Sequence, residues 1–202
     1  MRILGTVRYA TWALGLALLA PSCFAAADED KKVDLKQGDL APVFEGLDDN
    51  GKSWKSSDFV GKKYIVLYFY PGDFTPGCMR QAENFRDSMN KLTEKGVLVV
   101  GVSADSLKTH QLFKQTQKLN FTLLTDEEGS LAEKVGVPAG KGGDVKTKDA
   151  DGQPVTLTRK ATFTRWTFVI GKDGKIASKN TKANPMTDSK DVAELIEKLE
   201  KQ

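Results

Sequence analysis

The chain has 202 residues, with 30 Lys and Arg against 27 Asp and Glu and a formal net charge of +3 at pH 7. This near balance gives little support to nucleic-acid binding, which depends on clustered positive charge. The length suffices for one ordinary domain with a sizeable hydrophobic core.

Residues 1–27 have the pattern of a secretory signal peptide. Arg2 and Arg8 give a basic start, residues 12–20 form an apolar core too short to span a membrane, and residues 23–27 offer small-residue cleavage sites. We therefore expect an exported protein, periplasmic or secreted. Because the two arginines are the only charged residues there, their removal lowers the net charge from +3 to +1. The alternative is a lipoprotein anchored through Cys23, although residues 20–23 match that pattern poorly.

Residues 28–36 are charged and predict a flexible lead, and residues 37–202 predict a single domain. A hairpin turn is expected at 48–51 and a buried strand at 64–70. The later elements follow in chain order: a helix from 78 to about 96, strand 97–102, helix 106–119, strand 121–124, a short helix ending near 135, strands 163–170 and 175–180, and helix 188–200. Residues 136–160 are rich in Gly, Lys, Asp and Thr and predict an irregular insertion, open to a hairpin around Gly152.

The most informative stretch joins the strand at 64–70 to the helix that follows it. Pro71, Gly72, Pro76 and Gly77 mark a turn, and Cys78 then stands at the start of the helix. Unpaired N–H groups and the helix dipole favour a thiolate at that place. An inert buried cysteine is the competing interpretation, which the position at a helix start argues against.

Thr75 lies three residues before Cys78, so its hydroxyl can turn towards the sulfur. A hydroxyl there can accept a hydrogen bond from an incoming O–H group. A helix cap is an equally good interpretation of Thr75 from spacing alone. Pro71 fixes one backbone angle of the loop.

Taken together, Pro71-x-x-x-Thr75-x-x-Cys78 resembles the active-site signature of the peroxiredoxins (AhpC/TSA type). The longer run from Phe69 to Cys78 is similar to the bacterioferritin-comigratory protein branch, also called the PrxQ type, and the likeness covers roughly residues 35 to 200. It implies an α/β thioredoxin-like fold, with a mixed central sheet flanked by helices. It also implies a thiolate that attacks a peroxide and becomes a sulfenic acid, with no cofactor and no metal.

The resemblance also suggests which groups support this cysteine. Arg165 opens a segment similar to the family's Arg-x-Thr/Ser-Phe strand, and it is the candidate cation for the thiolate and the peroxide oxygens. Arg159 is the fallback. Gln81 matches a position where the family holds Glu or Gln to brace the arginine, and Trp166 is expected in the core or the pocket wall.

Outside the leader Cys78 is the single cysteine, so no internal disulfide can form. Glu83 occupies the position where many relatives carry a second cysteine. A one-cysteine cycle with an external thiol, a thioredoxin-like protein or a small thiol, is therefore expected. We expect a monomer or a weak dimer. His110, the only histidine, has no second ligand near it in sequence, which argues against a Cys–His dyad.

Two other classes of function compete. A thiol–disulfide oxidoreductase of the thioredoxin class needs a Cys-x-x-Cys pair, and Gln81 stands where its second cysteine would be. A non-enzymatic exported binding protein would have no need for Thr75, Cys78 and Arg165 together.

Overall fold

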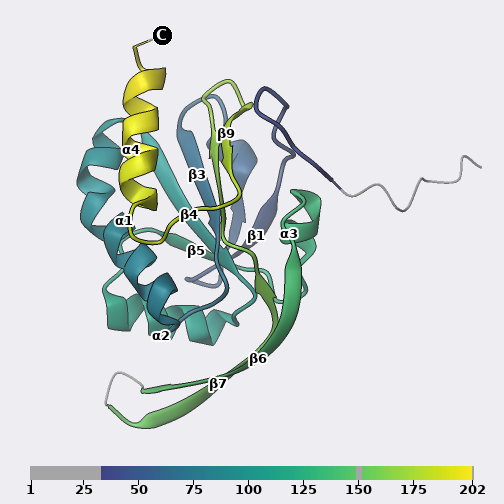
Figure 1. Ribbon diagram of the computed structural model, residues 1–202, viewed down its shortest axis with the longest axis vertical. Helices are drawn as coiled ribbons and strands as arrows, with labels where there is room; N and C mark the ends of the chain where they lie inside the picture. Colours follow the sequence, from purple (N-terminus) through teal and green to yellow (C-terminus); the bar gives the residue numbers. More distant parts are fainter. Residues whose placement is uncertain (1–32, 149–151, 202) are drawn as a thin grey trace, which may run out of the picture. The chain divides into compact units, whose positions relative to one another are not determined.

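Seven strands form the central sheet of the protein (Figure 1). Side by side they are β2 (Ser53–Lys55), β1 (Glu45–Asp48), β5 (Thr122–Thr125), β4 (Val97–Ser103), β3 (Tyr64–Phe69), β8 (Trp166–Ile170) and β9 (Ile176–Asn180). Strands β3, β4 and β5 run parallel, and the remaining pairs are antiparallel. The mixed sheet expected from the sequence is confirmed.

This description comes from a computed structural model that describes residues 33–148 and 152–201. The expected signal peptide, the alternative lipidation site at Cys23 and the first part of the flexible lead lie outside these residues. Within them, no helix is both long and apolar enough to cross a membrane.

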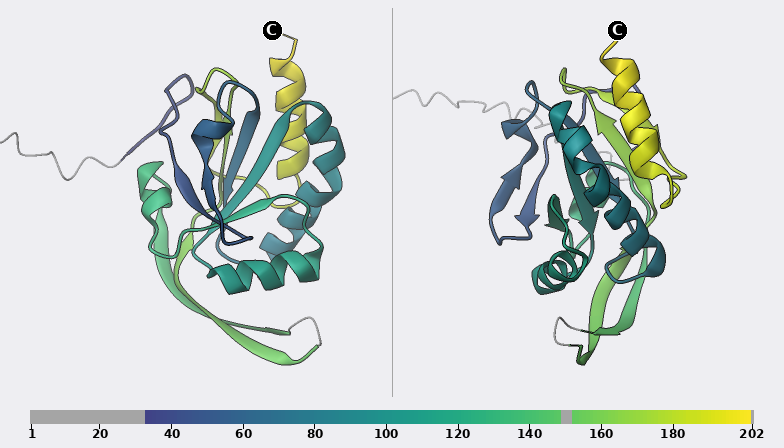
Figure 2. Two further views of the ribbon diagram at one scale, coloured as in Figure 1. Left: turned by 180° about the vertical axis from the view of Figure 1, so that it is seen from behind. Right: turned by 90° about the vertical axis from the view of Figure 1, so that its left-hand side faces the viewer.

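Helices cover the sheet on both faces. α1 (Pro76–Glu94), α2 (Leu107–Gln117) and α4 (Asp188–Leu199) share one buried cluster, while α3 (Ser130–Lys134) and the short 3₁₀ helix Ser56–Asp58 adjoin the other. The edge view in Figure 2 shows α4 on the opposite side from β1 and β2. This layering follows from the period of two in β3, where Val66 and Tyr68 face the first cluster and Ile65 and Leu67 face the second.

The order of elements places the end of β3 where chemistry is expected. β3 is central, and α1 begins a few residues after its carboxyl end. The amino end of β8 lies at the same edge, because Phe69 pairs with Trp166. Loops at the carboxyl ends of parallel strands commonly carry ligand and catalytic sites in α/β sheets.

The segment 136–160 is more regular than the sequence indicates. β6 (Ala139–Lys148) and β7 (Pro154–Phe163) pair as a long antiparallel ribbon, which curves away from the central sheet and passes below α2 in Figures 1 and 2. The open alternative of a hairpin is therefore right, and the irregular insertion is wrong. The tip of the ribbon, residues 149–151, lies outside the described residues.

The strand expected at 163–170 is also two elements. Phe163 ends β7 in the ribbon, and Trp166 begins β8 in the central sheet. Thr164 and Arg165 form the link between them, so Arg165 is not part of a strand ladder. The link frees the Arg165 side chain to turn towards α1.

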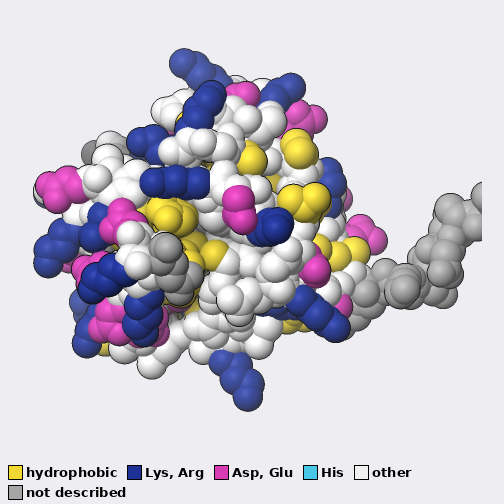
Figure 3. Space-filling model, turned by 90° about the horizontal axis from the view of Figure 1, so that it is seen from above, with side chains coloured by type: hydrophobic (Ala, Val, Ile, Leu, Met, Phe, Trp, Pro, Cys, Tyr) yellow, Lys and Arg dark blue, Asp and Glu magenta, His cyan; other side chains and the backbone are white. Residues whose placement is uncertain are grey.

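Charges on the surface are mixed. In the view from above, Lys and Arg side chains alternate with Asp and Glu around small apolar areas (Figure 3). This face therefore offers no extended surface of one charge sign.

The aromatic stack under α1 gives a test of the packing. Phe85 is fully buried, with its ring centroid 4.9 Å from that of Tyr68 and 6.4 Å from that of Phe121. We predict that Phe85→Ala lowers the free energy of unfolding by about 3 to 5 kcal/mol, because it leaves a cavity. Urea unfolding measures this loss. Lys91→Ala, an exposed site on the same helix, should change it by less than about 0.5 kcal/mol. A loss for Phe85→Ala no larger than for Lys91→Ala would contradict this packing.

Candidate active site

Cys78 is the third residue of α1 and is almost completely buried, with 1% of its surface exposed. The helix begins at Pro76, which has no N–H to leave unpaired. The N–H groups of Gly77 and Cys78 have no acceptor within the helix. The sulfur therefore lies at the end of α1 where partial positive charge collects.

The loop that leads into α1 has an unusual backbone. Gly72 has φ of 153° and Phe74 has φ of 58°, a left-handed conformation that a residue with a side chain seldom adopts. Phe74 packs edge-on against Phe113, with ring centroids 5.2 Å apart. Pro71 is half-buried at the start of this loop, directly after Tyr70. The loop must therefore be held in place by its surroundings.

Thr75 occupies the N-cap position of α1, but its side chain makes no capping hydrogen bond. Its hydroxyl instead donates to the carbonyl oxygen of Gly72 at 3.1 Å. The capping interpretation of its side chain is thus wrong. The hydroxyl proton is committed to the loop, which leaves the oxygen lone pairs as acceptors.

Arg165 reaches the sulfur of Cys78. Its Nη2 lies 3.1 Å from Sγ, and its Nη1 donates to Oε1 of Gln81. Gln81 stands one turn after Cys78 on α1 and is completely buried. The structure thus joins the three residues that the sequence singled out as nucleophile, cation and brace.

Asp188, the first residue of α4, extends this row. Its Oδ2 accepts from Nε2 of Gln81 at 2.6 Å and from the Thr167 hydroxyl at 2.8 Å. Because a carboxylate offers only acceptors, it turns the Gln81 NH₂ group towards itself and the Gln81 carbonyl oxygen towards Arg165. Burial raises the pKa of Asp188, against the effect of the two donors.

A second set of buried polar groups lies behind the loop. Asp73 is fully buried, and its carboxylate accepts from the Tyr70 hydroxyl at 2.8 Å and contacts Nδ1 of His110 at 2.8 Å. Burial, and then the charge of Asp73, raises the pKa of Tyr70, so the phenol stays protonated as a donor. The loop is therefore anchored from within by its own aspartate.

Each ring nitrogen of His110 faces an acceptor inside the protein. Nδ1 faces the Asp73 carboxylate, and Nε2 faces the carbonyl oxygen of Leu124 at 3.2 Å. Two acceptors require two N–H donors, which only the imidazolium has. Burial alone would lower the pKa of His110, but Asp73, Asp105 and the Leu124 carbonyl together raise it.

Asp105 and Arg159 complete this second set. The Asp105 carboxylate accepts from the backbone N–H of Asp73 at 2.8 Å, from Ser103 Oγ at 2.8 Å and from Nε of Arg159 at 3.0 Å. Nη2 of Arg159 donates to the Asp73 carbonyl oxygen at 2.9 Å. The fallback assignment of Arg159 to the sulfur is wrong, because its guanidinium is occupied behind the loop.

Three further residues, two of them considered from the sequence, lie away from the sulfur. Arg80 and Glu83 form an ion pair of 3.1 Å on the outer side of α1, with the Arg80 side chain 56% exposed. Trp166 is half-buried, packs against the second core cluster and has the Lys179 ammonium 4.5 Å from its ring centroid. Neither Glu83 nor Trp166 takes part in the hydrogen bonds around Cys78.

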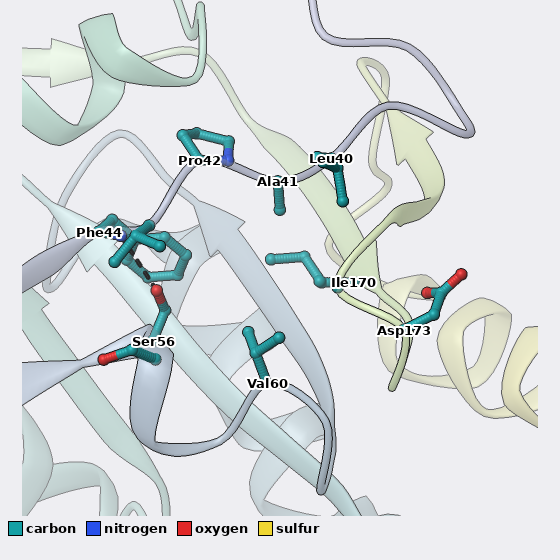
Figure 4. A pocket seen from close by; sticks show the side chains of 11 residues that line it. Leu40, Ala41, Pro42, Phe44, Ser56, Val60, Ile170 and Asp173 are labelled. Atoms are coloured by element: carbon teal, nitrogen blue, oxygen red, sulfur yellow. Dashed lines mark hydrogen bonds between the residues drawn. The ribbon is translucent and has the colours of Figure 1, made fainter.

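An apolar pocket lies elsewhere on the protein. Figure 4 shows Leu40, Pro42, Val60 and Ile170 around it, with the Phe44 N–H donating to Ser56 Oγ at 3.0 Å. None of the residues that surround Cys78 lines this pocket. It is therefore separate from the candidate active site.

The sequence interpretation missed Asp188, Asp73 and Asp105. For two of them a signal existed, since Asp73 and Asp105 each come just after the carboxyl end of a buried strand, β3 and β4, and these strands are parallel neighbours. Asp188 gave no such signal. As the first residue of a helix it is expected to interact with the helix dipole rather than with a distant glutamine.

Comparisons with known proteins show the family of this chain. The model of the AhpC/TSA family matches residues 37–179. A putative peroxiredoxin bcp of Coxiella burnetii is 44% identical over 109 residues, which are 54% of this chain and 72% of the relative. Peroxiredoxin Bcp of Escherichia coli K12 is 39% identical over 142 residues, which are 70% of this chain and 83% of the relative.

Solved structures show the same fold. The crystal structure of peroxidoxin BcpB from Mycobacterium tuberculosis has a TM-score of 0.67 and 26% identity, and the match covers 82% of this chain and 99% of that one. The thioredoxin-like fold implied by the sequence motif is confirmed. The chain belongs to the AhpC/TSA family, in its Bcp/peroxiredoxin Q branch.

The row that ends at Asp188 can be tested with two substitutions of similar size. In Asp188→Asn the amide oxygen can keep both hydrogen bonds, whereas Asp188→Leu removes the acceptor and frees the Gln81 amide. We predict that the Leu variant oxidises with hydrogen peroxide about tenfold or more slowly, while the Asn variant stays near wild type, because misplacing Arg165 is costly. Rapid-quench trapping of the sulfenic acid measures both rates. Equal rates in the two variants would contradict the orienting role.

The His110–Asp73 pair predicts a pH dependence of stability. Because folding raises the pKa of His110, its stabilisation is complete below the unfolded pKa of about 6.5 and is lost as the pH rises through the folded value. His110→Gln cannot titrate. The stability advantage of wild type over this variant should therefore shrink from pH 6 to pH 9 in urea unfolding. An advantage that stays constant with pH would show that folding does not raise the pKa of His110.

Proposed function

We propose that this protein is a thiol-dependent peroxidase that reduces hydrogen peroxide and organic hydroperoxides through Cys78, in a one-cysteine cycle that serves antioxidant defence. The observation that carries this proposal is the Cys78–Arg165 contact, a buried thiol and a guanidinium 3.1 Å apart at the start of a helix. Membership of the Bcp/peroxiredoxin Q branch supports the same chemistry.

The first step needs an oriented peroxide and a stabilised leaving group. The Cys78 thiolate attacks the terminal oxygen, so that an S–O bond forms and the O–O bond breaks. The leaving oxygen takes up a proton and departs as water or an alcohol, and Cys78 becomes a sulfenic acid. The sulfur is oxidised by two electrons, and the peroxide is reduced by two.

Each neighbour has a definite part in this step. The Thr75 oxygen, with its proton committed to Gly72, accepts the O–H of the peroxide. The N–H groups at the start of α1 and the free N–H groups of Arg165 face the oxygens on which charge develops. Pro71 shapes the loop, and Gln81 keeps the guanidinium in position.

Recycling of the sulfenic acid requires a thiol from outside. Cys78 is the only cysteine among the described residues, and Glu83 is paired with Arg80. One external thiol displaces water to form a mixed disulfide, and a second releases the Cys78 thiol. A thioredoxin-like protein or a small thiol fits this role. Because Cys78 is only 1% exposed, its sulfur has to become more accessible for this exchange.

We propose export to the periplasm or secretion on the strength of residues 1–27, with their basic start and short apolar core. We also propose a monomer or a weak dimer.

The other two functions have less support. A thioredoxin-class oxidoreductase would need a thiol where Gln81 is found, and that residue is fully buried and bonded to Arg165 and Asp188. A binding protein would have no use for a guanidinium held against a buried sulfur.

The proposal predicts one rapidly trapped sulfenic acid when the reduced protein, residues 28–202, meets one equivalent of hydrogen peroxide. Cys78→Ser should abolish it. Arg165→Ala should slow it by about a hundredfold, because one preorganised donor is worth that much in a transition state. Intact-mass kinetics with a sulfenic-acid trap measure the rates, and Arg80→Ala serves as the matched control on the exposed side of α1. A thiol that oxidises no faster than free cysteine would refute the peroxidase proposal.

A further inference from the structure

The β6–β7 ribbon makes non-covalent contacts with the loop that carries the catalytic residues. Most of its side chains are exposed, but Arg159 on β7 is only 6% exposed. Val145 and Leu157, which face each other across the ribbon, pack against the core cluster that contains Phe74 and Cys78. The ribbon therefore contacts the active-site side of the protein through one cation and one apolar pair.

Arg159 lies directly on the loop backbone. A Cβ atom built on Gly72 would stand 2.3 Å from Cζ of Arg159, so no residue larger than glycine fits while the guanidinium is there. The same guanidinium donates to the Asp73 carbonyl oxygen, and its partner Asp105 accepts from the Asp73 N–H. Both backbone groups of Asp73 are thus fixed by one ion pair.

This ion pair fixes the residues on which the site depends. Asp73 precedes Phe74 with its left-handed backbone, and Thr75 donates to the carbonyl of Gly72. A shift of residues 72 and 73 would therefore move the Thr75 hydroxyl and the first turn of α1. The hydrogen bonds of Arg159 go to Asp105 and to the Asp73 carbonyl oxygen, not to Cys78.

We propose that Arg159 is a positioning residue for the Cys78 loop, through which the β6–β7 ribbon holds residues 72–75 in the reactive conformation. The inference deepens the proposed peroxidase function and rests on it for its kinetic consequence. Its structural part, control of access to the buried thiol, is measurable without any peroxide.

The charge balance among the buried side chains around Asp73 determines which variants can test this proposal. Asp73 and Asp105 are balanced by His110 and Arg159, and all four side chains are buried. Replacing Arg159 alone leaves a buried negative charge without its partner, which threatens folding. The double variant Arg159→Gln/Asp105→Asn removes one charge of each sign, so His110 and Asp73 still balance. Arg159→Lys keeps the charge but loses the fork that spans two acceptors.

The experiment measures two rates on each variant of the mature protein, after thermal unfolding has shown that it folds. One is the oxidation of Cys78 by hydrogen peroxide, and the other is its alkylation by iodoacetamide, which reports access to the thiol. Lys160→Gln is the matched control, because Lys160 is the next residue on β7, is exposed and pairs with Glu128 on the surface.

We expect the double variant to oxidise about ten- to a hundredfold more slowly and to be alkylated faster, because a loosened loop misplaces the reacting groups and exposes the sulfur. Arg159→Lys should recover part of both rates, and Lys160→Gln should match wild type. Folded variants with both rates unchanged would overturn the proposal, as would failure of both Arg159 variants to fold. If wild type itself reacts slowly with peroxide, the proposed function fails, while a change in alkylation still tests the positioning.

Discussion

Arg165 is held at the sulfur of Cys78 by a row of buried partners, Gln81 and Asp188. An arginine side chain carries about 2 kcal/mol of rotamer entropy, which must be offset before it is fixed in one place. Gln81 accepts from it, and Asp188 fixes the amide of Gln81. The guanidinium therefore needs no reorganisation when charge develops on a leaving oxygen, which is the basis of electrostatic catalysis.

The buried charged groups around Asp73 cost desolvation free energy, and they act on the backbone rather than on the sulfur. Four charged side chains are taken out of water around Asp73, and a well-packed apolar replacement is often as stable as such a set or more so. Its effect lies in the backbone, where Asp105 and Arg159 satisfy the N–H and carbonyl of Asp73 beside the left-handed Phe74. A conformation that costs about 1 to 3 kcal/mol persists only where its surroundings determine it so fully.

Hydrophobic periodicity predicted the helices and strands that bury one face in the core. It failed for elements whose structure does not depend on such burial. The helix after Cys78 and strands β3 and β4 stand as expected, and the sequence motif brought Arg165 and Gln81 to the right site. The ribbon was left open as a hairpin within an irregular insertion, because β6 is mostly exposed and rich in Gly and Lys. The alternation of Val155, Leu157, Ala161 and Phe163 in β7 was the signal that could have predicted a strand there. The break between the two sheets falls at the polar pair Thr164 and Arg165, which is too short to predict the end of a strand.

The different roles of Arg159 and Arg165 follow from that break. Arg159 and Arg165 are close together in the sequence. Either could have been assigned to the thiol from spacing alone. Arg159 remains in the ribbon ladder, where its side chain meets Asp105 and the backbone at Gly72. Arg165 lies in the two-residue link between β7 and β8, so it belongs to neither the ribbon nor the central sheet. This link is next to the carboxyl end of β3, close to the start of α1, and Arg165 reaches the sulfur from there. Strand connectivity thus decides which cation contacts Cys78 and which holds the loop.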